Sequence, residues 1–504
     1  MAEPTAAAIP ADAPAAHGSH RQIVRSSLLM GGASLIVTAL GIARLKALAL
    51  LLGPVGIGQV GLFLNLVALG ASIAGFGLNA SGVRELAAAR AADDQPRLDA
   101  HRRALLWASL ALAASALLLF GLLRAPIAHH MLFDPALART VGYLGIAVAL
   151  TVLSSYCVTL LNGFRDLRAL ARVQVGGALL GTVVGVAFVL LFGSNGIFYY
   201  VLAAPAAGLL VGTILVRRLP RPASPPTPPR ELVANAATMM RLGTAFMLSG
   251  MALNAAVLLV RGMIGDHLGP FALGQFAAAW IISNTYVAIV LQAMGMDFFP
   301  RLSAAIDDPP QAARLIAEQV EVALLLATPI LIATMAAAPW LLRLAYADAF
   351  APAAPLLRWM ILGDVLKIAA WPLALSLLAQ RRGAVYLAVE CFAAVTFLAV
   401  TFALIRLPSS NVAVAGAAYV AMYALYRAAL ILAVGRGLRP GRTTILATAA
   451  ALGATAAIFA IGARSDLWAL LLGFPLAAAA AWFALRRLDQ LGALPARLQR
   501  RPRV

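Results

Sequence analysis

Residues 52–59 read LGPVGIGQ and residues 268–275 read LGPFALGQ, so one pattern returns 216 positions later. Each copy follows an apolar run that ends in basic residues, which are Arg44 and Lys46 before the first copy and Arg261 before the second. A Gly-Pro pair within apolar sequence marks a point where one helix stops and another starts. The recurrence predicts two halves of similar structure.

A second pair of motifs is in register with the first. Residues 84–86 read REL ahead of 93–94 (DD), and residues 301–302 read RL ahead of 307–308 (DD). Six apolar runs separate the copies, so both halves would cross a membrane in the same direction. Parallel repeats are typical of transporters whose two lobes rock about a central site, which predicts alternating access. Candidate gate residues in these loops are Arg84, Asp297 and Arg301.

The whole chain is apolar enough to lie within a lipid bilayer. Of its 504 residues, 62% are hydrophobic and 12% are charged, and the mean hydropathy is +0.89. Soluble proteins carry about 25% charged residues. No single globular core could bury this much apolar surface, which excludes a soluble enzyme. We predict an all-α integral membrane protein.

The positions of the membrane-spanning helices follow from the apolar runs. A spanning helix needs about 20 mostly apolar residues. Fourteen runs meet this requirement, near 27–49, 58–80, 104–123, 140–161, 173–192, 197–216, 242–262, 271–294, 319–341, 355–378, 385–406, 413–435, 443–462 and 467–485.

The basic residues set the orientation. If the N-terminus is cytoplasmic, the inside connections hold 28 of the 39 Lys and Arg residues and the outside connections and helix ends hold 8. The positive-inside rule then predicts that both termini are cytoplasmic. The net charge of +19 is explained by this topology, and we expect no nucleic-acid partner.

Two lobes, a linker and two tails are expected from this layout. Six prolines fall between Arg217 and Arg230, a composition that predicts a cytoplasmic linker with neither helix nor strand. The expected segments are a disordered Ala/Pro-rich tail (1–21), an N-lobe (22–216), the linker (217–241), a C-lobe (242–435), two further helices (436–485) and a basic cytoplasmic tail (486–504).

Four cations in or beside the apolar runs are candidate substrate ligands. A charge at the centre of a membrane helix costs about 2.5–3.5 kcal/mol, so such residues should face a cavity, pair or reach the interface. Arginine and lysine lining a cavity would suit an anionic group such as phosphate. The alternative for the first three is snorkelling to the interface. The four residues are Arg44, Lys46, Arg261 and Lys367.

Acidic residues in the spans are candidates for ion coupling. Asp364 and Lys367 are three positions apart and share a helix face. They either neutralise each other or separate, Lys367 to the substrate and Asp364 to a proton or cation. Glu390 and Glu321 are further coupling candidates, and Arg427 is a candidate counter-charge; a structural role for each stays open.

Several motifs do not predict chemistry. Residues 56–61 match a dinucleotide-binding pattern, but no βαβ unit surrounds them and we interpret them as a helix start. His129-His130 near Asp134 would be a poor metal site, and two isolated cysteines, Cys157 and Cys391, predict neither a disulfide nor a metal centre. We expect no cofactor and no metal.

The chain resembles the polysaccharide-unit flippases of the O-antigen translocase family. The similarity is carried by GIARLKALALLLGPVGIGQVGLF (41–63) and SGVRELAAA (81–89). It extends through NGFRD (162–166), FFPRLS (298–303) and WMILGDVLK (359–367), and covers residues from about 22 to 435. The last two predicted helices are less clearly matched.

The resemblance implies the multidrug/oligosaccharidyl-lipid/polysaccharide (MOP) exporter fold, with two six-helix lobes around a cationic cavity. It implies substrates that are undecaprenyl-diphosphate-linked oligosaccharides of the O-antigen, enterobacterial-common-antigen or exopolysaccharide type. These would move to the periplasmic leaflet of the inner membrane, and a polysaccharide polymerase or chain-length complex is an expected partner. Similar flippases also carry charge at positions that correspond to Lys46, Arg261, Asp364, Lys367 and Glu390.

The membrane potential could supply the energy for this transport without an ATPase. A diphosphate carries about two negative charges, and each gains about 2.3 kcal/mol per 100 mV on moving outward. Three alternatives stay open. A cation-coupled multidrug exporter of the same superfamily would need acidic residues to dominate the cavity, whereas the spans carry more Arg and Lys than Asp and Glu. A lipid II flippase would be essential for growth, and a glycosyltransferase or polymerase would need a large soluble loop. The longest connection is about 25 residues, so we expect no enzyme.

Overall fold

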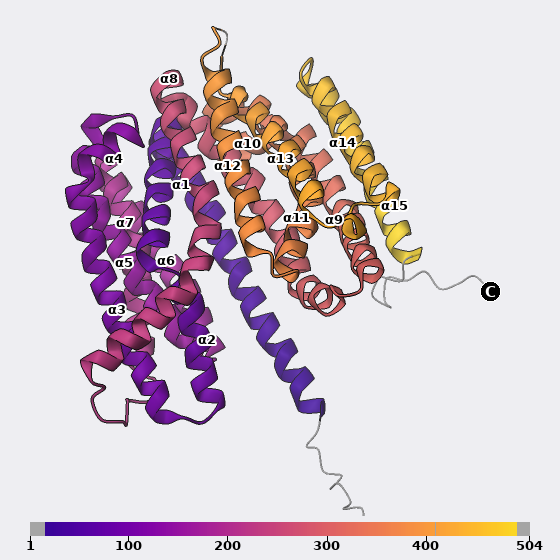
Figure 1. The fold of residues 1–504 in the computed structure, drawn as a ribbon. Coiled ribbons are helices and arrows are strands. Elements are labelled where there is room, and N and C mark those ends of the chain that lie inside the picture. The colour runs from indigo at the N-terminus through magenta and orange to yellow at the C-terminus, as the bar shows by residue number, and fades with distance from the viewer. Residues whose placement is uncertain (1–15, 409, 491–504) are drawn as a thin grey trace, which may run out of the picture.

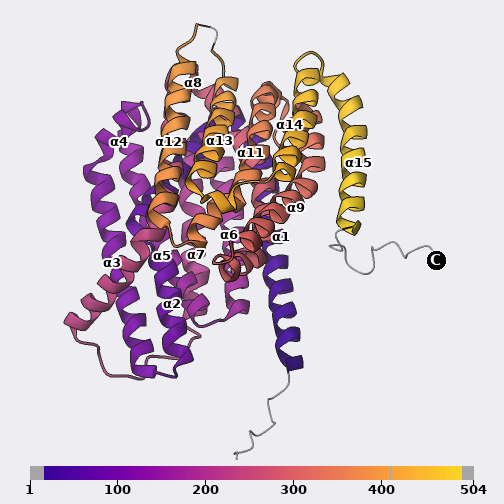
Figure 2. The ribbon, with the colours of Figure 1, turned by 45° about the vertical axis from the view of Figure 1, so that its right-hand side comes forward.

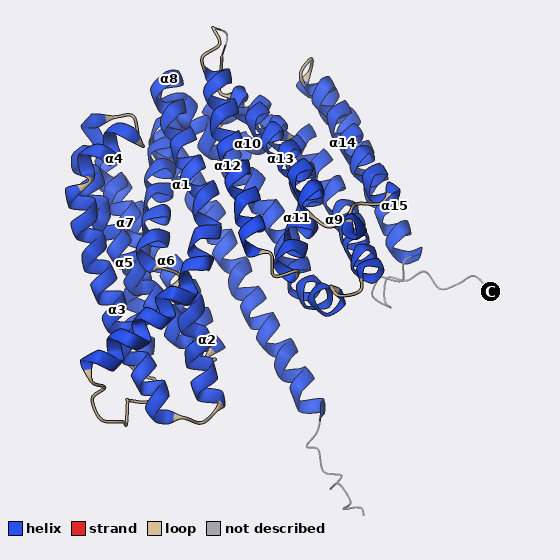
Figure 3. Ribbon diagram, in the orientation of Figure 1, coloured by secondary structure: helices blue, strands red, loops and turns tan. Residues whose placement is uncertain are grey.

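The computed structural model describes residues 16–408 and 410–490, with side chains from Gly31 onward except at several positions within 242–250 and 289–297. Within those residues every regular element is helical (Figure 3). The helices are α1 (Ala16–Gly75), α2 (Leu78–Ala91), α3 (Gln95–Leu122), α4 (Arg124–His130), α5 (Ala138–Gly163), α6 (Leu167–Phe192), α7 (Gly196–Val216), α8 (Pro229–Ala305), α9 (Pro309–Ala336), α10 (Ala338–Ala345), α11 (Ala354–Ala379), α12 (Gly383–Ile405), α13 (Ala413–Ala433), α14 (Arg442–Gly462) and α15 (Asp466–Gln490). Short 3₁₀ turns are η1 (Pro135–Leu137), η2 (Gly193–Asn195), η3 (Asp348–Ala353) and η4 (Arg436–Leu438).

The prediction of a polytopic all-α protein is confirmed. In the described residues, 11 segments are long and apolar enough to cross a membrane. Three of them, Gly31–Gly75, Leu167–Val216 and Met251–Ala288, have 45, 50 and 38 residues, which is about twice the length that one crossing requires. Each of the three contains a backbone break, so each crosses twice. The segments therefore account for all fourteen predicted crossings.

The two copies of the repeated motif have the same backbone geometry. Gly53 in α1 has φ 61° and ψ −168°, and Gly269 in α8 has φ 85° and ψ 169°. Only glycine adopts such angles readily. Pro54 and Pro270 follow directly, at the first position of a new helical segment, where proline is well tolerated. The repeat therefore encodes a matching kink in each half.

The chain folds into two helical lobes that meet at these kinks. In Figure 1 α2–α7 (violet to magenta) lie to the left of the helices that follow α8 (salmon to yellow), and the first part of α1 (indigo) runs down and to the right from between them. α1 and α8 pack together. A Cβ at Gly274 would overlap the Pro54 carbonyl of α1. A Cβ at Gly58 would in turn overlap the backbone of Gly274 in α8. We call this side, marked by Gly53 and Gly269, the kink end.

The opposite side carries the proline-rich connection, and we call it the linker end. Our predicted boundaries there need correction. α8 begins at Pro229, so only 217–228 lacks a long helix, because proline is accepted in a first helical turn. α1 begins at Ala16, so 16–21 are helical, and α15 continues to Gln490. The predicted tails otherwise fall on 1–15 and 491–504, outside the described residues.

The linker is fastened to the N-lobe. The buried Asp99 carboxylate of α3 accepts hydrogen bonds from the backbone N–H groups of Ala223 and Ser224, at 2.9 and 3.0 Å. Arg102 donates to the Pro220 carbonyl at 2.5 Å, and Arg103 donates to the Ser224 carbonyl at 2.5 Å. The linker thus lies along α3 as part of the N-lobe.

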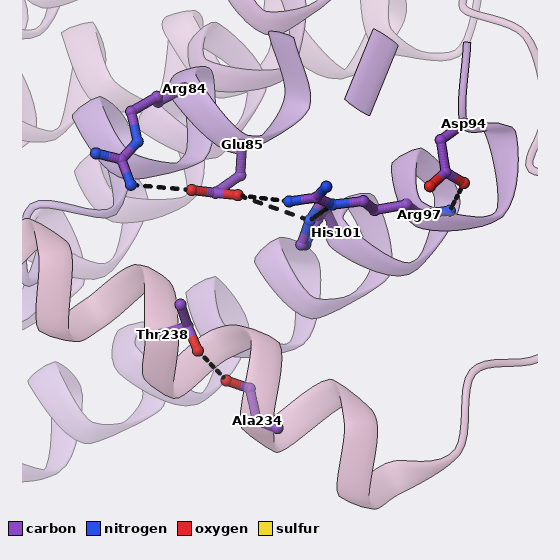
Figure 4. A network of polar contacts seen from close by, with 7 residues as sticks. All are labelled: Arg84, Glu85, Asp94, Arg97, His101, Ala234 and Thr238. Carbon is purple, nitrogen blue, oxygen red and sulfur yellow. Dashed lines mark hydrogen bonds and ion pairs between the residues drawn. The ribbon is translucent and has the colours of Figure 1, made fainter. Parts of the chain in front are cut away.

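A charged network joins α2 to α3 beside this linker (Figure 4). Glu85 lies between Arg84, at 3.1 Å, and Arg97, at 3.4 Å, with His101 at 3.9 Å. The first turns of α8, drawn with Ala234 and Thr238, pass through the same region. The linker end of the N-lobe is therefore held by polar contacts and by close packing of the Gly77 and Gly243 backbones, and the kink end is held by close backbone packing.

The last two helices pack on the outside of the C-lobe (Figure 2). Arg358 of α11 is 3% exposed. Its guanidinium donates to the Gly462 carbonyl at 2.7 Å and to the Asp466 carboxylate at 2.8 Å. It thereby anchors the α14–α15 turn to the core of the C-lobe.

Candidate functional site

A crevice opens between the lobes next to the kink end. It has a volume of about 340 Å³ and is lined by Arg44, Gly61, Tyr200, Ile281 and Thr285 among other residues of α1, α7 and α8. We call it the Arg44 crevice. Both lobes contribute to its wall, because α8 presents Ile281 and Thr285, one helical turn apart, toward the N-lobe.

Arg44 provides the positive charge on the N-lobe side of this crevice. Its side chain is half-buried, and its guanidinium carbon lies 5.7 Å from the centre of the Tyr200 ring. Its Nε is buried and has no hydrogen-bond acceptor among the residues that the structure describes. The stacked ring fixes the guanidinium and leaves donor groups available for a ligand.

Arg261 places a second guanidinium at the same wall. The residue is 4% exposed, and its Nη1 occupies the space that a Gly61 side chain would fill. Its Nε and Nη1 lack an acceptor within the described part of the chain. A buried donor without an acceptor costs about 1–3 kcal/mol, and more when charged. The fold therefore maintains a costly cation beside the crevice, which is typical of a binding site for an anion.

The other two predicted cavity cations, Lys46 and Lys367, do not line the Arg44 crevice. Lys46 is two positions from Arg44, and residues two apart on a helix do not share a face. Its ammonium donates to the Arg343 carbonyl at 3.0 Å, which links α1 to α10 across the lobes. Lys367 lies in a separate pocket of the C-lobe.

This second pocket is walled by aromatic side chains. It has a volume of about 180 Å³ between α8, α11, α12 and α13. Lys367 donates to the Asn284 side-chain oxygen at 2.9 Å and lies 5.7 Å from the centre of the Tyr423 ring. Glu390 accepts a hydrogen bond from Tyr426 at 2.6 Å. We call it the C-lobe pocket; it is lined by Leu253, Leu291, Lys367, Trp371, Glu390, Ala393, Met422, Tyr423 and Tyr426.

Asp364 lies deeper in the C-lobe than Lys367. It is 0% exposed and accepts hydrogen bonds from Ser283 at 2.8 Å, from Tyr419 at 2.9 Å and from Tyr286. Asp364 and Lys367 thus have different hydrogen-bond partners in this structure. Three hydroxyl donors hold Asp364, while Lys367 faces the pocket.

The remaining candidates do not join either pocket. Glu321 pairs with Arg487 of α15 at 2.8 Å and so connects α9 to α15. It does not line the C-lobe pocket with Lys367 and Glu390. Arg427 is buried in α13, and its Nε has no acceptor among the described residues.

The gate candidates lie on α2 and in the last turns of α8. Arg84 is exposed and contacts Glu85, Arg301 is exposed near the end of α8, and the side chain of Asp297 lies outside the described residues. His129 and His130 contact each other, and no cluster of metal-ligating residues occurs in the part of the chain that was described.

Sequence reasoning missed the aromatic residues of both pockets. Tyr419, Tyr423 and Tyr426 follow one another at four and three positions, which places them on one face of α13. That spacing could have been recognised. No comparable spacing in the sequence marks Tyr200 or Trp371, because the residues that line the pockets with them come mostly from other helices.

Comparisons with known proteins agree with this architecture. Residues 47–355 match the family described as polysaccharide biosynthesis protein. The chain belongs to this family. The matched segment includes both copies of the repeat, Arg261 and part of the crevice wall, and it begins three residues after Arg44.

Relatives and solved structures extend this result. The chain is 24% identical over 410 residues to the lipid III flippase of Escherichia coli (strain K12), covering 80% of this chain and 96% of the relative. Among structures, an inward-facing multidrug resistance MATE transporter of the MOP superfamily has a TM-score of 0.66 at 16% identity, covering 82% of this chain and 95% of that chain. Lipid II flippase MurJ, in an inward closed conformation, has a TM-score of 0.65 at 12% identity, covering 92% and 100%. This polysaccharide biosynthesis family member therefore has the MOP fold, and the proteins it resembles are flippases and transporters, which agrees with the prediction that it is not an enzyme.

Proposed function

We propose that the protein is a flippase that moves undecaprenyl-diphosphate-linked oligosaccharides from the cytoplasmic to the periplasmic leaflet of the bacterial inner membrane. The observation that carries this proposal is the pair of guanidinium groups at the Arg44 crevice, which have buried donors without acceptors. A diphosphate supplies several anionic oxygens in the geometry that guanidinium groups bind best. The similarity to a lipid III flippase supports a lipid-linked glycan as substrate.

The charge of the crevice argues for an anion rather than a cationic drug. Arg44 lines it and Arg261 abuts its wall, and a cationic ligand would be repelled by both. A multidrug exporter that couples to cations would instead need a carboxylate in this wall. The position of the two arginines between the lobes suits a diphosphate that is handed across as the lobes move.

The linker end and the kink end would face opposite sides of the membrane. The linker end carries most of the basic loops, so it would face the cytoplasm together with both termini. The closed packing of Gly58, Gly274 and Pro54 would then seal the periplasmic side. The glycan and diphosphate would enter from the linker end while the polyprenyl chain stays in the surrounding lipid.

Energy for export would come from the membrane potential acting on the diphosphate, at about 2.3 kcal/mol per charge per 100 mV. Asp364 and Glu390 are the proposed coupling residues, because both are carboxylates inside the C-lobe that hydroxyl donors hold in place. Contact with a polysaccharide polymerase or chain-length complex remains part of the proposal. It would place the released glycan where it is polymerised.

The test is transport by the purified full-length chain in proteoliposomes. The probe is undecaprenyl diphosphate that carries a single N-acetylhexosamine, and the readout is its appearance in the opposite leaflet. Arg44→Gln and Arg261→Gln should each slow transport about tenfold or more, since a hydrogen bond to a charged group contributes about 1.5–3 kcal/mol. Arg314→Gln, at an exposed arginine of α9, serves as the control and should transport normally. Normal transport by the Arg44, Arg261 double variant would contradict the proposal.

A further inference from the structure

The C-lobe pocket is a compartment separate from the Arg44 crevice. The second half of α8 lies between them. Ile281 and Thr285 face the crevice, whereas Asn284 of the same segment accepts the hydrogen bond from Lys367. A substrate that has two chemically different parts could therefore place one part on each side of this helix.

The wall of the C-lobe pocket has two kinds of surface. Trp371, Tyr423 and Tyr426 provide aromatic faces, while Lys367 and Glu390 provide one cation and one carboxylate. Small-molecule sites are commonly built this way, from mostly apolar walls and a few placed polar groups. A hydrocarbon chain would leave the remaining hydrogen-bonding positions of both charged groups unused, and Glu390 would repel a phosphate.

The two charged groups are held in place before any ligand arrives. Asn284 fixes the Lys367 ammonium, and Tyr426 fixes the Glu390 carboxylate. An ammonium has three donors and a carboxylate about four acceptor positions, so each keeps capacity for a ligand. The pocket thus offers a fixed donor and a fixed acceptor beside flat apolar faces.

A pyranose ring matches this combination. Its C–H face is apolar and flat, and its hydroxyl groups both donate and accept hydrogen bonds around the edge. We propose that the C-lobe pocket binds one pyranose ring of the glycan, which stacks on Trp371 or Tyr423 and bonds to Lys367 and Glu390. This rests on the proposed function and assigns Lys367 to the sugar, while Arg44 and Arg261 take the diphosphate.

The experiment compares two probes on the full-length protein in detergent. One is undecaprenyl diphosphate, and the other is the same lipid with a single N-acetylhexosamine. Trp371→Leu and Tyr423→Leu should weaken binding of the sugar-bearing probe about tenfold or more, as truncating an anchor in a buried site does. In the same two variants, the dissociation constant for undecaprenyl diphosphate should change by less than about twofold.

Further variants separate a binding role from a structural one. Trp371→Phe keeps an aromatic face and should restore most of the sugar-dependent affinity. Trp468→Leu, at an exposed position on α15, is the matched control and should bind both probes normally. Arg261→Gln should weaken both probes to a similar extent.

The outcomes distinguish this inference from the function on which it rests. If wild-type protein binds neither probe, the proposed function fails and the sugar site with it. If it binds both, but Trp371→Leu and Tyr423→Leu leave the difference between the probes unchanged, the flippase proposal stands and the sugar site is wrong. An equal loss for both probes in these variants also overturns the sugar site.

Discussion

The glycine contact at the kink end makes a quantitative prediction about conformation. A Cβ at Gly274 would overlap the Pro54 carbonyl of the opposite lobe. That carbonyl belongs to the backbone and cannot rotate aside, so Gly274→Ala strains the closed kink end. Overpacking of this kind costs about 1–3 kcal/mol. The strain is relieved when the lobes separate there, so the ratio of closed to open molecules should fall about 5- to 150-fold.

The assay is double electron–electron resonance between one spin label in each lobe. Arg139 and Arg406 are exposed near the kink end and can carry the labels after Cys157 and Cys391 have been replaced. Gly274→Ala should add or enlarge a population with a longer distance between the labels. In proteoliposomes it should also slow transport, because the two states are no longer balanced.

Gly265→Ala is the matched control for this experiment. It lies in the same helix and gains the same helix propensity, about 1 kcal/mol, but a Cβ there meets only ordinary contact with Leu273. It should leave the distance distribution unchanged. Identical distributions for wild type and Gly274→Ala, or the same shift in Gly265→Ala, would refute the reasoning.

Three further predictions follow from other contacts. Asp99→Ala removes the acceptor for two linker N–H groups, so limited trypsin digestion should cut after Arg218 or Arg230 several-fold faster than in wild type. An unchanged rate would show that the linker is not held there. Arg358→Met breaks buried hydrogen bonds to the α14–α15 turn and should lower the free energy of unfolding by about 2–4 kcal/mol. Thermal denaturation in detergent measures this loss, and an unchanged melting temperature would contradict the role of Arg358. Asp364→Asn removes a charge held by three hydroxyl groups. It should slow transport about tenfold or more with little effect on probe binding. A variant that transports normally would exclude Asp364 from coupling.

Much of the fold could be predicted because its determinants are local in sequence. Apolar runs of sufficient length specify membrane helices, and the repeated Gly-Pro pair specifies the two kinks, where Gly53 and Gly269 have the same backbone conformation. The boundaries that were wrong depend on weaker signals. Pro229 was interpreted as a helix breaker, although proline is compatible with a first helical turn.

The site could be predicted only in part because its contacts join distant helices. Helical spacing alone could have separated Arg44 from Lys46, since positions two apart point to different faces. The partners of Asp364 come from two other helices, at separations of 55 to 81 residues for Tyr419 and Ser283, and no local pattern reveals them. The same holds for Gly61, whose missing side chain makes room for Arg261.

The central claim is that this chain moves a lipid-linked glycan, and deletion of its gene in the native host tests it most directly. Undecaprenyl-diphosphate glycans would be quantified by mass spectrometry together with their accessibility from the periplasm. The account predicts that a complete repeat unit accumulates in the cytoplasmic leaflet, shielded from the periplasm. A normal, accessible glycan pool together with altered sensitivity to cationic drugs would contradict it and favour a multidrug exporter.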